Sequence, residues 1–159
     1  MMKLLIIYYS KGGNTRHIAD YFRNQLQQQF QNREIQGDIQ MFDALHVRSL
    51  DLSSLKAADG FVFGSPDYFG YVSGYIKAIF DEIYSIRSNL VNRPSLGYIS
   101  HGGGGNATQS LNQLIQWNKL NLLEPVFSIK GCNITNDQQK LISHACDTLV
   151  NHIRTLKEG

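Results

Sequence analysis

The stretch Leu4-Leu5-Ile6-Ile7-Tyr8-Tyr9-Ser10-Lys11-Gly12-Gly13-Asn14-Thr15 joins an apolar run directly to a glycine-containing turn. The apolar run is typical of a buried β-strand over residues 3–9. An amphipathic helix is expected over residues 15–30, because its apolar side chains repeat every four residues. A buried strand that turns at once into an amphipathic helix is the unit from which parallel α/β sheets are built, so this stretch predicts an α/β fold.

The turn itself, residues 10–15, has the composition of an anion-binding loop. Two consecutive glycines, Gly12 and Gly13, permit positive φ angles that let backbone N–H groups converge on one point. The helix that follows starts with unpaired amides and the positive end of its dipole, which together favour a phosphate group. Asn14 or Thr15 could instead cap the helix. An ordinary strand-to-helix turn is therefore the alternative that this loop leaves open.

The remaining sequence alternates strand and helix patterns. Residues 60–64 have the unbroken apolar character of a central parallel strand, whereas residues 35–42 alternate like a half-exposed edge strand. Further strands are expected at residues 96–100 and 126–130, and the last strand is expected at the other edge. Five strand–helix pairs in strict alternation predict a parallel sheet with helices on both faces.

Capping and periodicity place the helices between these strands. A short helix is expected over residues 52–58, and Ser73 can cap the next one, which ends before Pro94. The next helix carries Ala107, Leu111, Leu114 and Ile115 along one stripe. Thr135 and Gln138 form a capping box that opens the last helix. The side chains of that helix expected to face the core are Leu141, Ala145, Leu149 and Ile153.

Length and composition narrow the class of protein. The 159 residues contain no repeat or linker, so a single domain over residues 1–159 is expected. A net charge of +2, without a basic run, gives no indication of nucleic-acid binding. Cys132 and Cys146 are neither clustered nor spaced for a metal site, and the apolar N-terminal run is too short to span a membrane. A cytoplasmic protein with reduced thiols and no bound metal is expected.

Three loops are expected to meet at one edge of the sheet. Ligands of doubly wound sheets bind beyond the carboxyl ends of the strands, where the strand order reverses. The loops there are residues 10–15, 65–71 and 100–106, which are all polar and contain glycine. A phosphate on the first loop and a planar group between the other two would fit one mononucleotide.

At this point the sequence resembles a known family. Residues 10–15 resemble the phosphate loop of flavodoxins, and Gly64-Ser65-Pro66-Asp67-Tyr68-Phe69-Gly70 resembles their flavin loop. The continuation, residues 71–81, is similar to flavodoxin-like NAD(P)H:quinone oxidoreductases and FMN reductases. The resemblance implies a flavodoxin-like, doubly wound three-layer sandwich with a five-stranded parallel sheet in the order 2-1-3-4-5. It also implies FMN as the cofactor and NAD(P)H as the electron donor.

The resemblance places the FMN phosphate at residues 10–15 and the isoalloxazine ring between residues 66–70 and 100–104. Glycine backbone in these loops would permit close approach to the ring. The cofactor-binding residues that it implies are Ser10, Lys11, Gly12, Gly13, Asn14, Thr15, Pro66, Asp67, Tyr68, Phe69, Gly70, Ser100, His101, Gly102, Gly103 and Gly104.

Several side chains in these loops have more than one possible role. Tyr68 and Phe69 could form the wall of a flavin slot by stacking, or pack on the protein itself. His101 is the candidate catalytic residue, which could offer a proton or a positive charge to the reduced flavin, or could bond to backbone. Lys11 could attract the phosphate or be a solvated surface lysine. Asp67 could point to solvent or steer a substrate amine.

Two functions of different class follow from the resemblance. The first is an enzyme that passes electrons from NAD(P)H through FMN to a quinone or similar small acceptor. The second is a flavodoxin-type electron carrier between protein partners. The net positive charge departs from the acidic surface of carrier flavodoxins and favours the enzyme. The chain also has no room for the segments that build a tetramer in quinone oxidoreductases, which weakens a direct transfer of their activity. The partners expected are a small-molecule electron acceptor or a redox protein, with a homodimer as an open alternative.

Overall fold

The computed structural model describes residues 1–159 and contains one seven-stranded sheet. The strand order is β2-β1-β3-β5-β6, with all of these pairs parallel, and β7 also pairs parallel with β5. In chain order this is the predicted 2-1-3-4-5 arrangement, which is confirmed. The strands are β1 (Met2–Tyr8), β2 (Gly37–Asp43), β3 (Gly60–Tyr68), β4 (Tyr71–Val72), β5 (Pro94–His101), β6 (Asn121–Leu122) and β7 (Phe127–Lys130).

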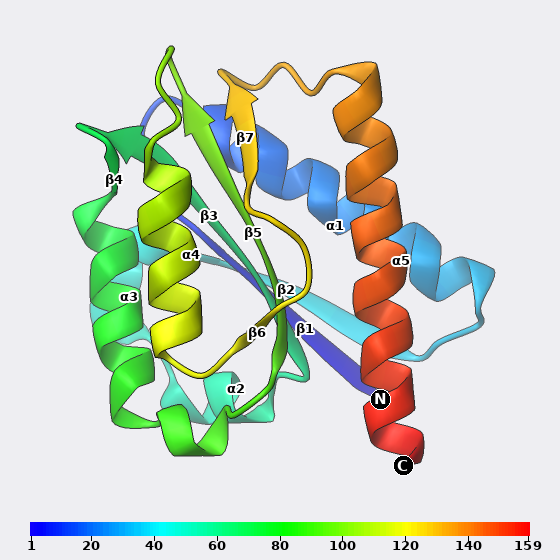
Figure 1. Cartoon of the computed structure of the whole chain (residues 1–159). Helices are drawn as coiled ribbons and strands as arrows, with labels where there is room; N and C mark the ends of the chain where they lie inside the picture. Colours follow the sequence, from blue (N-terminus) through cyan, green and yellow to red (C-terminus); the bar gives the residue numbers. More distant parts are fainter.

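Helices cover both faces of the sheet, which makes the predicted three-layer sandwich (Figure 1). On one face lie α1 (Asn14–Asn32) and α5 (Asn136–Glu158), and on the other lie α3 (Gly74–Ser85) and α4 (Ala107–Trp117). None of the helices combines the length and the apolar character that a membrane crossing requires. The shorter helical segments are η1 (Ala44–Ser49), α2 (Leu52–Ala57) and η2 (Arg87–Asn89).

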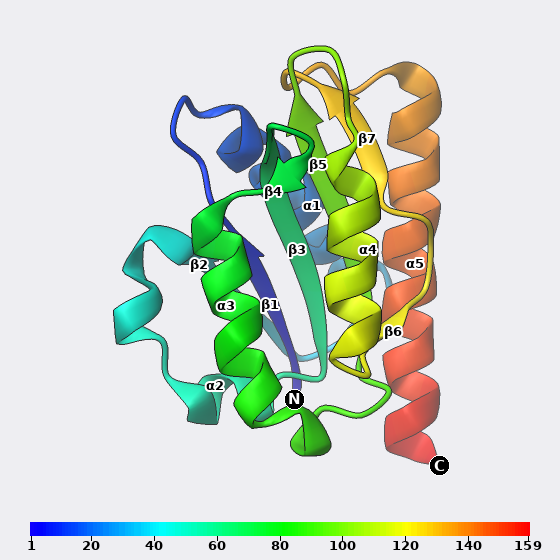
Figure 2. The same cartoon turned by 60° about the vertical axis from the view of Figure 1, so that its left-hand side comes forward.

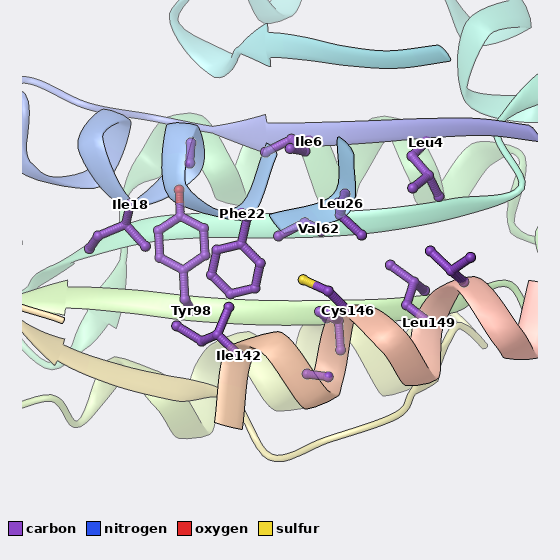
Figure 3. Packing of buried hydrophobic residues seen from close by; sticks show 14 of the residues in the cluster. Leu4, Ile6, Ile18, Phe22, Leu26, Val62, Tyr98, Ile142, Cys146 and Leu149 are labelled. Atoms are coloured by element: carbon purple, nitrogen blue, oxygen red, sulfur yellow. The ribbon is translucent and has the colours of Figure 1, made fainter. Parts of the chain in front are cut away.

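Each face of the sheet buries its own hydrophobic cluster. Figure 3 shows the cluster under α1 and α5, where Phe22, Tyr98 and Cys146 pack between the helices and the strands. The second cluster lies under α3 and α4. β3 contributes to both clusters, because every residue over 60–65 is buried, as the apolar run predicted. The caps predicted at Ser73 and at Thr135 with Gln138 are also confirmed.

The structure departs from the predicted elements mainly at the sheet edges. β3 does not end at Gly64 but continues through Tyr68, because Asp67 and Tyr68 pair antiparallel with β4 in a hairpin. Phe69 and Gly70 form its turn with φ angles of 57° and 78°, the pattern of a two-residue hairpin turn. The last strand, expected at residues 126–130, is present as β7, and an additional short strand, β6, precedes it; both pair with β5.

One predicted core residue is wrong. Leu141 is exposed, and its neighbour Ile142 is fully buried instead. The inward face of α5 follows the helical three- and four-residue steps from Ile142 to Ala145 and Cys146, and then to Leu149 and Ile153. The prediction assumed a four-residue spacing throughout and therefore placed Leu141, four residues before Ala145, on the buried face. An α-helix has 3.6 residues per turn, so the buried residue at this turn is Ile142, three residues before Ala145.

A row of three residues crosses the middle of the sheet under α1. Gly64 in β3 pairs with Tyr8 in β1 on one side and with Tyr98 in β5 on the other. The fully buried Tyr98 side chain lies over Gly64, and its hydroxyl donates a 2.8 Å hydrogen bond to the backbone carbonyl of Thr15 in the first turn of α1. Burial raises the pKa of Tyr98 well above its usual value, so the hydroxyl keeps its proton and remains a donor.

We expect Gly64→Ala to lower the free energy of unfolding by about 1–3 kcal/mol, the usual cost of overpacking a core. A Cβ at this position would lie 2.0 Å from Cζ of Tyr98 and would force the ring off the sheet. The matched control is Gly74→Ala at the start of α3, where an added Cβ meets no atom within 4 Å. Urea denaturation compares the two variants, and equal stabilities would contradict the packing of Tyr98 over Gly64.

Candidate functional site

The loops that follow four parallel strands line one cavity of about 720 Å³ at the carboxyl edge of the sheet. This volume lies within the range of small-molecule and cofactor sites. The loops after β1, β3 and β5 meet there as predicted, and the loop after β7 joins them. The lining residues are Ser10, Lys11, Gly12, Asn14, Thr15, Pro66, Asp67, Tyr68, Ser100, His101, Gly102, Lys130, Gly131 and Asn133.

The loop after β1 ends in a helix that no side chain caps. Gly13 occupies the N-cap position of α1 with a φ of 100°, and neither Asn14 nor Thr15 provides a cap. The hydroxyl of Ser10 accepts a hydrogen bond from the amide of Gly13 at 3.1 Å, which stabilises the turn. The amides of the first turn of α1 are therefore free to bind an anion. This geometry rules out the capped turn that the sequence left open.

Asp67 holds two of the loops together. Its Oδ1 accepts a 2.7 Å hydrogen bond from the amide of Gly70, and its Oδ2 accepts one of 3.1 Å from the amide of Ala107, the first residue of α4. Asn106, at the N-cap position, does not cap α4, so Asp67 takes over that role from another loop. Both carboxylate oxygens of Asp67 thus bind backbone, a role that the sequence analysis did not consider.

Three buried serines anchor the hairpin beside Asp67. The hydroxyl of Ser65 accepts a hydrogen bond from the amide of Ser73, and the Ser73 hydroxyl in turn caps α3 by accepting from Ile76. The hydroxyl of Ser110 in α4 accepts from the amide of Val72 in β4. These contacts tie the loop after β3 to α3 and α4.

The two aromatic residues of the hairpin have different positions. Tyr68 lines the cavity, and its ring lies 6.5 Å from that of Tyr9 in an edge-to-face arrangement. Burial, followed by the effect of Tyr9, raises the pKa of Tyr68, so its hydroxyl stays protonated at neutral pH. Phe69 lies at the tip of the hairpin and is fully exposed outside the cavity. Only one of the two rings expected to form a slot wall is therefore in place to do so.

The loops after β5 and β7 are joined at the far side of the cavity. The hydroxyl of Ser100 donates a 2.6 Å hydrogen bond to the carbonyl of Gly131, and the amide of Gly131 donates a 2.8 Å bond to the carbonyl of His101. Nδ1 of His101 is buried and has no hydrogen-bond partner. The backbone-bonded side chain considered as the alternative for His101 therefore does not occur at this atom. An unpartnered buried nitrogen at a cavity wall is a group that a ligand can satisfy.

The cavity contains most of the predicted site residues and three that the sequence analysis missed. Lys130, Gly131 and Asn133 lie at the end of a fourth strand and in the loop after it, whereas the sequence predicted a site built from the loops after three strands. The topology carried a signal for them, since the last strand ends at the same edge of the sheet next to β5. Five predicted residues do not line the cavity: Gly13, Phe69, Gly70, Gly103 and Gly104.

The donors of this cavity suit FMN. The free amides of α1, with Lys11 beside them, provide a place for a phosphate. Backbone of Ser100 and Gly102, the buried Nδ1 of His101 and the ring of Tyr68 provide polar and aromatic partners for a flavin ring. No group of three or more His, Cys, Asp or Glu side chains is arranged to hold a metal ion.

Comparisons with known proteins agree with this site. A family model described as NADPH-dependent FMN reductase matches residues 2–133. An NADPH azoreductase from Bacillus sp. (strain OY1-2) is 30% identical over 121 residues, which is 71% of this chain. A probable NAD(P)H dehydrogenase (quinone) from Arabidopsis thaliana is 33% identical over 76 residues, or 45% of this chain. The chain spans 66% of the length of the Bacillus protein and 28% of the Arabidopsis protein.

The fold also has close structural neighbours. A flavodoxin from the domain Archaea superposes with a TM-score of 0.76 over 96% of this chain and 99% of its own, at 17% sequence identity. This likeness confirms the flavodoxin-like fold that the two loops implied. Because the matching family model runs from the first strand to the loop after the last one, the chain belongs to the NADPH-dependent FMN reductase family.

Proposed function

We propose that the protein is an FMN-dependent oxidoreductase that takes electrons from NAD(P)H and passes them to a quinone or a similar small acceptor. The observation that carries the proposal is the uncapped start of α1 in the same cavity as the loops after β3 and β5. An anion site and a polar slot that share one cavity are what a mononucleotide requires. The names of the family and of the two relatives support the choice of electron donor and acceptor.

The residues divide between the two ends of the cofactor. The amides of the first turn of α1 hold the phosphate, and Ser10 keeps the turn in shape through its bond to Gly13. Lys11 and Lys130 are the two cationic side chains of the cavity, and they offset the negative charge of the phosphate. No ion pair within the protein involves either lysine.

Where the isoalloxazine ring of FMN would lie, the protein positions the ring and offers hydrogen bonds. Bound FMN would supply the chemistry of hydride acceptance and onward electron transfer. Tyr68 provides an aromatic wall, while the backbone of Ser100 and Gly102 offers donors and acceptors. His101 lines the cavity and would offer a proton or a positive charge to the ring, which makes it the candidate catalytic residue.

Three further features belong to the proposal. The chain acts as a single domain, which is supported by two hydrophobic clusters that pack on opposite faces of one sheet. The protein works in the cytoplasm, which is supported by the free thiols of Cys132 and Cys146. Its electron acceptor is a small molecule rather than a protein, which is supported by the names of the two relatives, a quinone dehydrogenase and an azoreductase.

Flavin binding tests the phosphate site. We expect FMN to bind about 100-fold more tightly than riboflavin, because charged hydrogen bonds to the phosphate each contribute about 1.5–3 kcal/mol. Gly13→Ala should weaken FMN binding about tenfold and leave riboflavin unchanged, since a side chain at a φ of 100° costs about 1–2 kcal/mol.

Quenching of flavin fluorescence measures both affinities. Gly74→Ala is the control, because Gly74 does not line the FMN cavity, an added Cβ there meets no atom within 4 Å, and its φ angle is not in the left-handed region. Equal affinities for FMN and riboflavin in the unaltered protein would contradict a phosphate site at α1.

Steady-state kinetics separates the enzyme from the carrier. We expect the FMN-loaded protein to oxidise NADPH in the presence of p-benzoquinone at about 1 s⁻¹ or faster, the ordinary range for enzymes. Flavin-free protein should be inactive, and activity should return with added FMN. FMN-loaded protein that passes electrons to a redox protein but does not oxidise NADPH or NADH would show a carrier instead.

A further inference from the structure

A second cavity, of about 480 Å³, lies on the α3 side of the sheet between the end of β1, η1 and the amino-terminal end of α3. Figure 2 shows the end of α3 next to β4, and η1 contacts α3 on its other side. Tyr68 lines both this cavity and the FMN cavity, and no other residue is shared. The lining residues are Tyr9, Val47, Arg48, Tyr68, Ser73, Gly74, Tyr75 and Ala78.

Three tyrosine rings form the walls of this tyrosine cavity. The rings of Tyr9 and Tyr75 stack with their centroids 4.6 Å apart, and the ring of Tyr68 stands at 72° to that of Tyr9. Tyr68 and Tyr75 are each about 40% exposed, although both rings are aromatic. A flat ring in this corner can lie face-on to one tyrosine and edge-on to another, the two arrangements that aromatic pairs prefer.

Arg48 supplies the charge of the tyrosine cavity. It is the one charged residue in the lining, it is exposed, and it takes part in none of the ion pairs of the protein. An unpaired guanidinium beside aromatic walls attracts an anion and offers it a planar set of donors. A neutral ligand would leave this group unused.

We propose that the tyrosine cavity is a second ligand site, which binds a flat aromatic molecule that carries one anionic group such as a carboxylate or sulfonate. The aromatic rings of the ligand pack against Tyr9, Tyr68 and Tyr75, and its anionic group pairs with Arg48. The volume limits the ligand to a small molecule. Of the eight lining residues, only Tyr68 also lines the FMN cavity, so the proposal does not rest on the proposed function.

Isothermal titration of the FMN-loaded protein with naphthalene-2-sulfonate tests this proposal, and 2-naphthalenemethanol serves as the uncharged probe. We expect one equivalent of the sulfonate to bind at least tenfold more tightly than the alcohol. Arg48→Ala should remove this difference, whereas Arg154→Ala, which alters an exposed arginine on α5, should leave it unchanged. Equal effects of the two arginine variants would overturn the proposal.

A second variant fills the cavity without replacing a tyrosine or Arg48. Gly74→Leu places a side chain at the first position of α3, where an added Cβ meets no atom within 4 Å. We expect this variant to lose binding of both naphthalene probes at least tenfold and to keep the affinity for FMN. Probe binding that survives in Gly74→Leu, or that FMN abolishes by competition, would assign the probe to a different site and overturn the proposal.

A third measurement distinguishes a ligand site from an interface between two copies of the chain. Sedimentation of the unaltered protein and of Gly74→Leu gives the oligomeric state of each. We expect the same state for both, with the unaltered protein binding the sulfonate. A dimer that Gly74→Leu dissociates, together with no sulfonate binding, would show that a second copy occupies the cavity.

Discussion

The hydrogen bond from the hydroxyl of Tyr98 to the carbonyl of Thr15 joins the two halves of the candidate site. Tyr98 belongs to β5, just before the loop that begins at Gly102, and Thr15 belongs to the first turn of α1 after the phosphate loop. The bond crosses β3, and it can do so because Gly64 leaves the space that any side chain would fill. One buried donor therefore fixes the position of the anion site relative to the loop after β5.

Other hydrogen bonds fix the position of the third loop of the candidate site, the one after β3. Asp67 binds the hairpin turn at Gly70 and the start of α4 at Ala107, and the buried serines hold β4 and α3 next to it. The polar side chains of these loops are thus used mainly to bind backbone, and the groups left free are the amides of α1, the lysines and Nδ1 of His101. These free groups are the ones that suit FMN, which is consistent with membership of the FMN reductase family.

The fold and the place of the site could be predicted because they depend on local patterns. The apolar run of β3, the glycines after β1 and the caps of α3 and α5 are each readable within a few residues. The role of Asp67 could not be predicted, because its partner Ala107 lies 40 residues further along the chain. The contribution of Lys130 and the exposure of Phe69 likewise depend on how strand ends and a hairpin are placed in space.

Amide chemical-shift mapping of an FMN titration tests the central claim most directly, because it locates the cofactor residue by residue. The account predicts that the largest ¹H–¹⁵N shifts occur at Asn14, Thr15 and Arg16, whose amides are free, with a second group at residues 100–102 and 130–133. Residues near the carboxyl end of α5, at the opposite end of the sheet (Figure 1), should not move. Large shifts confined to the tyrosine cavity, with none in the first turn of α1, would contradict the account.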